Sequence, residues 1–468
     1  MATSARDPGT RSALRSRVLE LLRRHGWNAT SFQILEQGFV YWFDGDSACV
    51  AYVDTGRAWV AAGAPIAAEA ELSVVAGRFV QAARERGRGV VFFATERRFI
   101  HADGFTSLLI GEQPVYDPRS WPATLREAAS LREQLRRARA KGVVVTPIDP
   151  AEVARQGAPL RRSIEALILR WMGSKALPPM GFLVRVDPFG FAHERRSFVA
   201  RLSDGAGGEI VGFAAVVPVY ARNGWFIEDL IRSPLAPNGT SELLVDAAMR
   251  CAAELGSGYL TLGLSPLAGA VGAPLDVAKR YGAPLYDFDG LQAFKAKFRP
   301  RDWSPIYLSF PTGQSAFGAI YASLSAFAQG GLSRYGLLTL LRGPDVVLRA
   351  LGLLLVPWTL LLANIDTRRW FPSPLVQWAW VAFDVGLCVA LFALGPRFHP
   401  LLSRVLVLLV AADAVLTLTQ ALTFNLPRAE GYADVLVVLT AIGAPALACL
   451  ILANAHRRWS RVHAASAE

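Results

Sequence analysis

The sequence has few cysteines, and they are not grouped. Its four cysteines stand far apart and form no Cys-x-x-Cys pair, so neither a disulfide framework nor a zinc site is expected, and a reducing compartment fits. The histidines show no metal-ligand spacing. The first 26 residues have no apolar core of signal-peptide length, and Thr261 and Ser265 lack the partners of a hydrolase triad. We therefore expect no metal, no cleaved export signal and no Ser-His-Asp chemistry.

Charge and lysine are also scarce. Charged residues make up 19 % of the 468 residues, against about 25 % in soluble proteins. Hydrophobic residues make up 52 % and the mean hydropathy is +0.30, which excludes disorder and indicates a membrane segment. The formal charge of 49 − 38 = +11 favours anionic partners such as nucleic acid, phosphate or an anionic membrane. Only five of the 49 basic residues are lysine.

Four apolar stretches of about twenty residues follow residue 344, each long enough to cross a hydrocarbon core of about 30 Å. They are Asp345–Ala363, Leu375–Leu394, Leu401–Phe424 and Asp434–Ala453. We predict four transmembrane helices over 344–456, a basic tail over 457–468, and a linker or interfacial helix over 313–343. Two acids lie near mid-span, Asp384 and Asp413. Either they face a shared polar cavity with Thr417 and Gln420, or they are neutral acids that fix helix packing.

Basic residues beside the spans predict their orientation, because cytoplasmic loops carry more lysine and arginine. One side has seven arginines: Arg334, Arg342, Arg397, Arg404, Arg457, Arg458 and Arg461. The other side has three: Arg368, Arg369 and Arg428. This excess predicts that the N-terminal part and the C-terminus are both cytoplasmic.

In the first 312 residues, segments with the pattern of a strand alternate with segments that have the pattern of a helix. This alternation predicts an α/β fold. Strands, a helix and a further strand occur twice, each time in about 150 residues. After a basic segment over 1–25, we predict two similar mixed-sheet domains over 26–155 and 156–312. The expected strands are 48–53, 58–62, 89–94, 143–147, 198–202, 209–219, 224–231 and 259–264, and the expected helices are 71–86, 123–141, 160–172 and 240–255.

The segment Arg84–Gly89 matches R-x-x-G-x-G, the pyrophosphate loop of acetyl-CoA-dependent acetyltransferases. That loop works between a strand and a helix N-terminus, whereas here a helix comes first and a strand follows. The corresponding loop of the second domain, after 224–231, has lost this spacing and contains two prolines. The topology is acetyltransferase-like, but the usual coenzyme A cradle is not evident.

The second half resembles the catalytic domain of the bacterial phosphatidylglycerol lysyl- and alanyltransferases, the multiple-peptide-resistance family. Five motifs carry the resemblance: Gly63-Ala-Pro65, the segment Leu131–Gly142, Glu228-Asp-Leu-Ile-Arg232, the segment Tyr259–Leu267 with its Gly-Leu-Ser-Pro-Leu ending, and Gly290-Leu-Gln-Ala-Phe-Lys-Ala-Lys-Phe-Arg-Pro300. They occur in the family's order and spacing, over about 30–310. The resemblance implies two tandem acetyltransferase-like (GNAT-like) domains that move an amino acid from aminoacyl-tRNA to a lipid headgroup. It also implies a location in the inner membrane of a bacterium, with the catalytic domains in the cytoplasm. In the best-known members a large membrane domain precedes the catalytic half, whereas the apolar spans here follow it.

The resemblance also implies the site. It places the acid and the arginine of the third motif, Asp229 and Arg232, in the active site. Asp229 is expected to hold the substrate ammonium or assist proton transfer, and Arg232 to bind phosphate or to pair with Asp229. Glu228 is a further candidate for binding substrate beside Asp229. Strand alternation, however, predicts that Glu228 and Asp229 lie on opposite faces of the strand.

Two lysines, Lys295 and Lys297, stand out because most basic residues of this chain are arginine. On a strand both would point to one face to meet a phosphate or an oxyanion, with Phe294, Ala296 and Phe298 opposite. Ser265 and Phe298, which lie in the matching motifs, are expected to bind substrate. Arg132, Arg136 and Arg137 lie on a basic helix that contacts tRNA or lipid phosphate, or is a solvated face.

We thus expect a membrane-anchored enzyme that esterifies phosphatidylglycerol or a related lipid with lysine, alanine or a similar amino acid and so alters membrane surface charge. Its partners are aminoacyl-tRNA as co-substrate, anionic phospholipid and the membrane, with no cofactor. Two alternatives remain open: a GNAT-like N-acyltransferase that uses acyl-CoA, and a non-catalytic membrane protein that senses lipid or tRNA through Asp384 and Asp413.

Overall fold

The computed structural model describes residues 2–3, 8–175, 177–202, 208–269, 271–272, 275, 280, 286–329, 331–342, 345–394 and 400–464. These residues form two compact units. The first unit comprises the described residues of 1–171 and 179–332. The second comprises those of 172–178 and 333–468.

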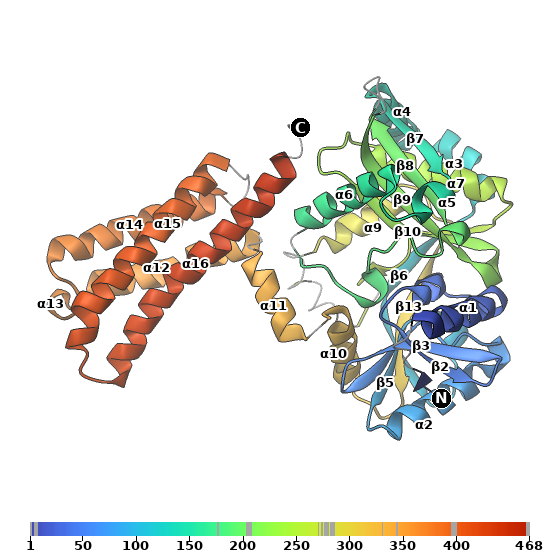
Figure 1. The fold of residues 1–468 in the computed structure, drawn as a ribbon, viewed down its shortest axis with the longest axis horizontal. Coiled ribbons are helices and arrows are strands. Elements are labelled where there is room, and N and C mark those ends of the chain that lie inside the picture. The colour runs from blue at the N-terminus through green and yellow to red at the C-terminus, as the bar shows by residue number, and fades with distance from the viewer. Residues whose placement is uncertain are drawn as a thin grey trace. The chain divides into compact units, whose positions relative to one another are not determined.

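The first unit contains an internal repeat, in which the same order of strands and helix occurs twice (Figure 1). We call the two occurrences the first and the second copy. In the first copy, three antiparallel strands are followed by a helix and a strand parallel to the third: β2 (Val40–Asp44), β3 (Ala48–Asp54), β4 (Ala58–Ala62), α2 (Leu72–Arg84) and β5 (Gly89–Thr95). The second copy repeats this order with β8 (Arg196–Leu202), β9 (Glu209–Val219), β10 (Gly224–Arg232), α7 (Thr240–Glu254) and β11 (Tyr259–Thr261). The predicted internal repeat is confirmed.

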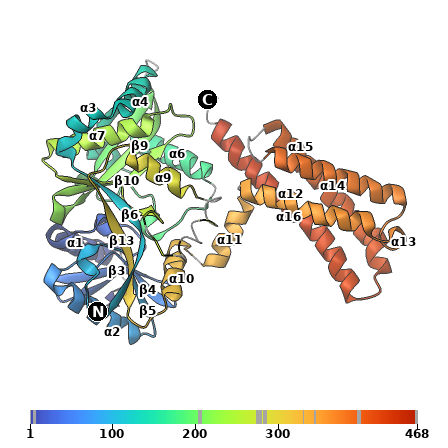
Figure 2. The ribbon, with the colours of Figure 1, turned by 180° about the vertical axis from the view of Figure 1, so that it is seen from behind.

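The two copies share a single sheet because each lends a strand to the other. Strand β6 (Phe105–Tyr116) leaves the first copy and pairs with β11, while β13 (Asp302–Pro311) leaves the second copy and pairs with β5. These two long strands also pair with each other, antiparallel, at the centre of the sheet (Figure 2). The strand order is β1-β2-β3-β4-β5-β13-β6-β11-β10-β9-β8-β7, and β12 (Ser265–Pro266) pairs with β6 off this path. The outer strands are β1 (Ala2–Thr3) and β7 (Val143–Ile148).

Helices cover both faces of the sheet, and alternation along the strands feeds both cores. On β3, Val50 and Tyr52 join the core beneath α2, whereas Cys49 and Ala51 join a core on the other face. That second core is completed by α1 (Pro8–His25), the 3-10 turn η1 (Ala29–Leu35) and α10 (Ala316–Phe327). In the second copy, a third core packs beneath α3 (Trp121–Glu127), α4 (Ala129–Ala140) and α7. The described residues of this part also form α5 (Pro150–Ala154), α6 (Pro159–Ser174) and α9 (Phe288–Ala296).

Three predicted elements differ in the structure. The basic helix over 123–141 is broken at Ala128, where φ is −87° and ψ is 71°, so it forms α3 and α4. The strand expected over 259–264 ends at Thr261. The segment around Lys295, expected as a strand, is the end of helix α9, which begins where Asp287 accepts a hydrogen bond from the Gly290 amide. Residues 203–207, between the strands expected over 198–202 and 209–219, lie outside the described residues.

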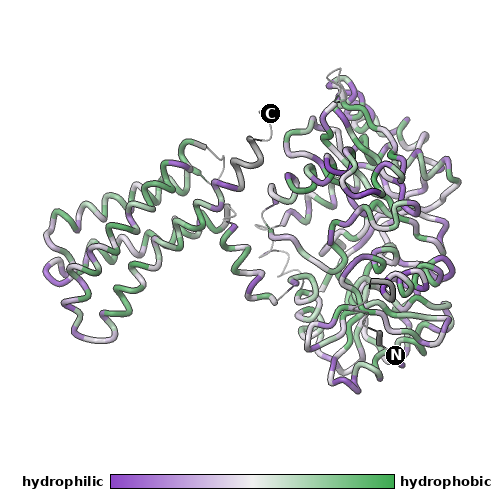
Figure 3. The backbone as a smooth tube through the Cα atoms, viewed as in Figure 1, coloured by the Kyte–Doolittle hydropathy of each residue, from purple (hydrophilic) through white to green (hydrophobic). Residues whose placement is uncertain are grey.

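The second unit is helical and largely apolar (Figure 3). Four of its helices contain segments long and apolar enough to cross a membrane: Val347–Asn364, Pro374–Leu394, Leu401–Arg428 and Tyr432–Arg457. They belong to α12 (Asp345–Asn364), α14 (Pro374–Leu394), α15 (Pro400–Gln420) with the turns that follow it, and α16 (Tyr432–Ala464), joined by the short helix α13 (Thr367–Trp370) and preceded by α11 (Leu332–Leu341). The predicted class, a mixed-sheet α/β part followed by four apolar helices, is confirmed.

Candidate active site

Strand β10 carries two adjacent acids at a bulge. Ile227 pairs with Val216 of β9 and Asp229 pairs with the next residue, Ala215, so Glu228 is an extra residue on its strand. The alternation that was predicted to separate Glu228 from Asp229 is therefore interrupted. Both side chains are buried, and only 2 % of the Glu228 side chain is exposed.

A buried arginine, Arg195, binds this pair of acids to a third acid from the other copy of the repeat. Its Nη1 donates to Glu228 Oε2, its Nη2 lies 3.6 Å from Glu36 Oε1, and its Nε donates to the Gly190 carbonyl at 2.8 Å. Glu36 directly follows η1 in the first copy, whereas Arg195 precedes β8 in the second. We call Glu36, Arg195, Glu228 and Asp229 the acid cluster.

The acid cluster holds more negative than positive charge. Burial, together with the charge of Glu228, raises the pKa of Asp229 to about 8 and that of Glu36 to about 10. Both oxygens of Glu36, Glu228 Oε1 and Asp229 Oδ2 accept no hydrogen bond from a described residue. An ionised carboxyl oxygen accepts several hydrogen bonds. The cluster can therefore bind a further cation such as an ammonium group, or hold protons near neutral pH.

Lys295 is buried near the end of α9. Its Nζ donates to the carbonyls of Gly263 and Leu264, at 2.8 and 2.9 Å, and burial lowers its pKa to about 7. Tyr116 holds the same lysine from the other side, through a hydrogen bond of 2.7 Å to its carbonyl. Lys295 therefore fixes the loop that leads into Ser265.

This loop packs directly on β10. Gly263 has φ of +71°, and a Cβ at this position would lie 2.6 Å from the ring of Phe226, which is on the same strand as Asp229. Ser265 is fully buried, and its Oγ has no hydrogen-bond partner among the described residues. The close approach of Gly263 to Phe226 thus places the loop beside β10. The same loop carries Ser265 and the carbonyls that Lys295 binds.

Arg232 and Lys297 are more accessible. Arg232 ends β10 and is half-buried, and its side chain forms no hydrogen bond or ion pair with any described residue. The alternative that it pairs with Asp229 is therefore wrong for this structure, and its guanidinium is available for another anion. Lys297 is half-exposed and lies 3.4 Å from Glu242 Oε1. The expectation that both lysines share one strand face is wrong, because α9 is a helix that buries Lys295 only.

The other predicted residues of the first unit lie away from the acid cluster. Phe298 is 1 % exposed and contacts other aromatic rings, so it is a core residue here: its neighbours are Tyr116, Trp121 and Phe294. On α4, Arg136 and Arg137 are exposed and both pair with Glu133, at 2.8 and 2.9 Å. Arg132 donates to the carbonyls of Leu125 and Arg126. The exposed face of α4 is basic, as expected.

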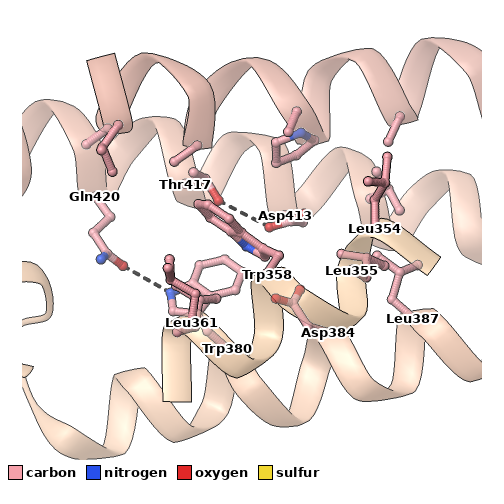
Figure 4. Close-up of a pocket in the computed structure, with 18 of the residues that line it drawn as sticks. Leu354, Leu355, Trp358, Leu361, Trp380, Asp384, Leu387, Asp413, Thr417 and Gln420 are labelled. Atoms are coloured by element: carbon pink, nitrogen blue, oxygen red, sulfur yellow. Dashed lines mark hydrogen bonds between the residues drawn. The ribbon is translucent and has the colours of Figure 1, made fainter. Parts of the chain in front are cut away.

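The two acids of the second unit line one cavity. Asp384 and Asp413 share it with Thr417 and Gln420, as one of the two interpretations of the sequence predicted (Figure 4). Asp413 Oδ1 accepts a hydrogen bond of 3.1 Å from Thr417 Oγ1.

The sequence did not single out Glu36 or Arg195. Neither lies in a recognisable motif, and Glu36 is far from β10 along the chain, so only the folded sheet brings them together. Within the described part of the chain, no group of three or more His, Cys, Asp or Glu side chains has the arrangement of a metal site.

Comparison with known proteins matches residues 15–310 to the family described as "Phosphatidylglycerol lysyltransferase, C-terminal". The phosphatidylglycerol lysyltransferase of Bacillus subtilis is 27 % identical over 316 residues, which cover 64 % of this chain and 35 % of that protein. An uncharacterized protein of Corynebacterium glutamicum is 26 % identical over 331 residues, covering 64 % and 40 %. The chain thus spans between a third and two fifths of the length of these relatives.

Two solved structures share the fold of the first unit. One is the C-terminal domain of a putative lysylphosphatidylglycerol synthetase from Agrobacterium fabrum, with a TM-score of 0.58. The other is L-PGS from Bacillus licheniformis, with a TM-score of 0.57. Each is 22 % identical to this chain, and each alignment covers 68 % of this chain and 96 % of the other.

Proposed function

The chain belongs to the family of phosphatidylglycerol lysyltransferase C-terminal domains, and from this membership we propose that it is a membrane-anchored aminoacyltransferase. It moves an amino acid from aminoacyl-tRNA to the headgroup hydroxyl of phosphatidylglycerol or a related lipid. The observation that carries the proposal is the acid cluster, in which Arg195 pairs with two buried carboxyl groups, Glu36 and Glu228, and the buried carboxyl group of Asp229 adjoins Glu228.

The acid cluster binds the ammonium group of the transferred amino acid. An aminoacyl ester carries its positive charge on an ammonium, which is a strong hydrogen-bond donor and needs acceptor oxygens when it is desolvated. Asp229 and Glu36 offer unused acceptors and lack full charge compensation. Because both acids have a raised pKa in the free protein, arrival of an ammonium favours loss of their protons.

In the transfer step, the lipid hydroxyl oxygen attacks the ester carbonyl carbon. A new ester bond forms to the lipid, the bond to the tRNA ribose oxygen breaks, and the hydroxyl proton passes to that ribose oxygen. Positioning of the two substrates and stabilisation of the developing oxyanion are the main demands. Lys295 holds the Gly263–Ser265 loop in place, and Arg232, which has no protein anion within the described residues, binds a phosphate of lipid or tRNA.

The competing donor, acyl-CoA, finds less support at the loop between β10 and α7. Backbone amides of this loop are already used within it: Leu235 donates to Ser233 Oγ, Ala236 to the Ser233 carbonyl, and Thr240 to the Pro237 carbonyl. A pyrophosphate at a helix N-terminus needs free amides. The matching segment Arg84–Gly89 runs from the end of α2 into β5, the reverse of the required order.

The proposal is tested with the full chain in nanodiscs that contain phosphatidylglycerol, supplied with tRNA charged with radiolabelled lysine, alanine or another amino acid. We expect label in the organic phase with at least one charged tRNA, and a loss of at least a hundredfold in Asp229→Asn. Glu133→Gln, an exposed acid on α4, is the control and retains activity. No label in lipid with any charged tRNA, or transfer from acyl-CoA in its place, contradicts the proposal.

A further inference from the structure

The second unit contains a cavity of about 350 Å³. It is bounded by α12, α14, α15 and α16, and its wall is mostly leucine, valine and alanine with three indole rings (Figure 4). This volume lies in the range of small-ligand sites, about 300–1,000 Å³. The cavity lies among the apolar segments that are long enough to cross a membrane.

Most polar side chains in the cavity bond to one another. Trp380 Nε1 donates to Gln420 Oε1 at 3.0 Å. The amide groups of Gln420 and Asn425 donate to the Trp370 carbonyl at 3.2 and 2.9 Å. These groups form a satisfied polar network at one part of the wall and require no ligand.

Asp384 is the exception. It is 6 % exposed, lines the cavity from α14, and has no hydrogen bond or ion pair with a described residue. Asp413, 8 % exposed on α15, accepts only the hydrogen bond from Thr417. None of the described residues that line the cavity is lysine, arginine or histidine. Ionisable groups within a membrane normally face a partner or a functional cavity, and here the protein supplies no cation.

We propose that this cavity binds the headgroup of a lipid that carries an organic ammonium. Carboxylates and the faces of indole rings are the groups that recognise such a cation, and Trp358 lines the same space as both acids (Figure 4). A Mg²⁺ or Ca²⁺ ion would need six or more oxygen ligands, which this apolar wall does not provide. The cavity holds the headgroup, and the acyl chains extend between the helices into the bilayer.

The identity of this lipid as the product of the chain's own reaction rests on the proposed function. Esterification with an amino acid adds an ammonium group to phosphatidylglycerol, which has none. A site that prefers the aminoacylated lipid over its precursor would remove product from the catalytic unit. The preference itself can be measured with added lipid, whether or not the chain makes it.

The test is binding of lysyl-phosphatidylglycerol and of phosphatidylglycerol to the full chain in detergent, measured by native mass spectrometry. For the wild-type chain we expect at least tenfold tighter binding of the aminoacylated lipid. Asp384→Asn and Asp413→Asn remove this preference with little change in shape, whereas Glu430→Gln, an exposed acid of the same unit outside the cavity, retains it. Dodecylammonium competes with the aminoacylated lipid, and dodecanol does not.

A second variant keeps both acids and fills the cavity, so that the test does not depend on the folding of the Asn variants. Ala441 lines the cavity from α16, and Ala441→Phe is expected to abolish binding of the aminoacylated lipid. Equal affinity of the wild-type chain for both lipids, or unchanged preference in Asp384→Asn and in Ala441→Phe, overturns the inference. Because lipid is added, failure of the transferase assay leaves this result intact, and the two proposals fail independently.

Discussion

Burial beside two other carboxyl groups keeps Glu36 protonated at neutral pH. Its pKa is raised to about 10, first by burial and then by the charge of Glu228, although Arg195 opposes the shift. A neutral acid of this kind is a hydrogen-bond donor that becomes an acceptor when a cation arrives. The acid cluster therefore links the protonation of the protein to the binding of its substrate.

The first prediction concerns the pH dependence of stability. An unfolded glutamate titrates near pH 4.3, so between pH 6 and 9 only the folded state holds the Glu36 proton. The folded state binds more protons, and its free energy of unfolding therefore falls as pH rises, by at most about 1.4 kcal/mol per pH unit. Thermal unfolding should show the wild-type chain losing stability relative to Glu36→Gln over this range.

Glu133→Gln is the matched control for that measurement. Hydrogen bonds from Arg136 and Arg137 lower the pKa of Glu133 to about 2, so this residue is ionised in both states above pH 6. Its variant should keep the wild-type pH slope. Parallel pH profiles for the wild-type chain and Glu36→Gln would contradict the assignment of a raised pKa.

Lys295 near the end of α9 and Lys297, which directly follows that helix, supply a second prediction. Lys295→Met leaves the carbonyls of Gly263 and Leu264 unpaired in the core and is expected to cost about 1–3 kcal/mol of stability. Lys297→Met breaks a half-exposed pair with Glu242 and is expected to cost less than about 1 kcal/mol. Thermal unfolding of both variants, with the transfer assay alongside, checks this. A larger loss of stability or activity in Lys297→Met than in Lys295→Met would contradict the assignment of Lys295 as the lysine that holds the loop.

Among the individual residues of the candidate active site, the sequence predicted some and missed others. Asp229, Arg232 and Lys295 were named from motif and composition, and the structure places Asp229 in the acid cluster and Lys295 against the loop of Ser265. Glu36 and Arg195 could not be predicted, because their roles arise from pairing across the two copies of the repeat. Phe298 was assigned to substrate from its motif, but motif position does not reveal that its ring packs in a core.

Among the elements, the loop between β11 and β12 depends most on one glycine. Gly263 adopts a positive φ and leaves no room for a Cβ beside Phe226. This close approach sets the position of the carbonyls that Lys295 binds. A substitution of Gly263 is therefore expected to shift the backbone carbonyls that Lys295 binds, and with them the candidate active site.

The third prediction compares two glycines with the same backbone angle. Gly263 and Gly256 both have φ of +71°, but a Cβ at Gly256 would meet nothing within 4 Å. Gly256→Ala should cost about 1–2 kcal/mol through backbone strain alone. Gly263→Ala adds overpacking against Phe226, about 1–3 kcal/mol more, and should also lower transfer activity. Equal losses in Tm for the two variants would show that the contact with Phe226 is not restrictive.

Local patterns predicted the elements that are locally determined. The strands predicted over 48–53, 58–62, 198–202 and 209–219 and the helix predicted over 71–86 all appear near their predicted bounds, as β3, β4, β8, β9 and α2. The strand predicted at Lys295 is wrong because five alternating residues fit a strand and the last turns of a helix equally well, and the cap at Asp287 decides for the helix. The pairing of β6 with β13 was not predicted, because nothing near either strand encodes a partner about 200 residues away.

For the whole molecule, the distribution of arginine predicts the orientation of the spans. Seven flanking arginines on one side and three on the other predict that the first unit and the C-terminus are both cytoplasmic. This side is also where aminoacyl-tRNA is found. The apolar excess of the composition belongs to the second unit. Under the proposed function, the basic excess is expected to meet the phosphates of tRNA and lipid.

The fourth prediction tests this orientation in a chain whose four native cysteines are replaced by serine. A cysteine in the connection between the third and fourth spans, Glu430→Cys, should react with a membrane-impermeant maleimide in intact spheroplasts. A cysteine in the C-terminal tail, Ser466→Cys, should react only after permeabilisation. The opposite labelling pattern would place the catalytic unit outside the cytoplasm.

The central claim is that the acid cluster serves transfer of an amino acid to a lipid. The most direct measurement is the lipid profile, by mass spectrometry, of cells that express the wild-type chain, Asp229→Asn or Glu133→Gln at equal levels. We predict an aminoacylated phosphatidylglycerol, or aminoacylated related lipid, with the wild-type chain and Glu133→Gln and none with Asp229→Asn. The absence of any such lipid with the wild-type chain, or an equal amount with Asp229→Asn, would contradict the claim.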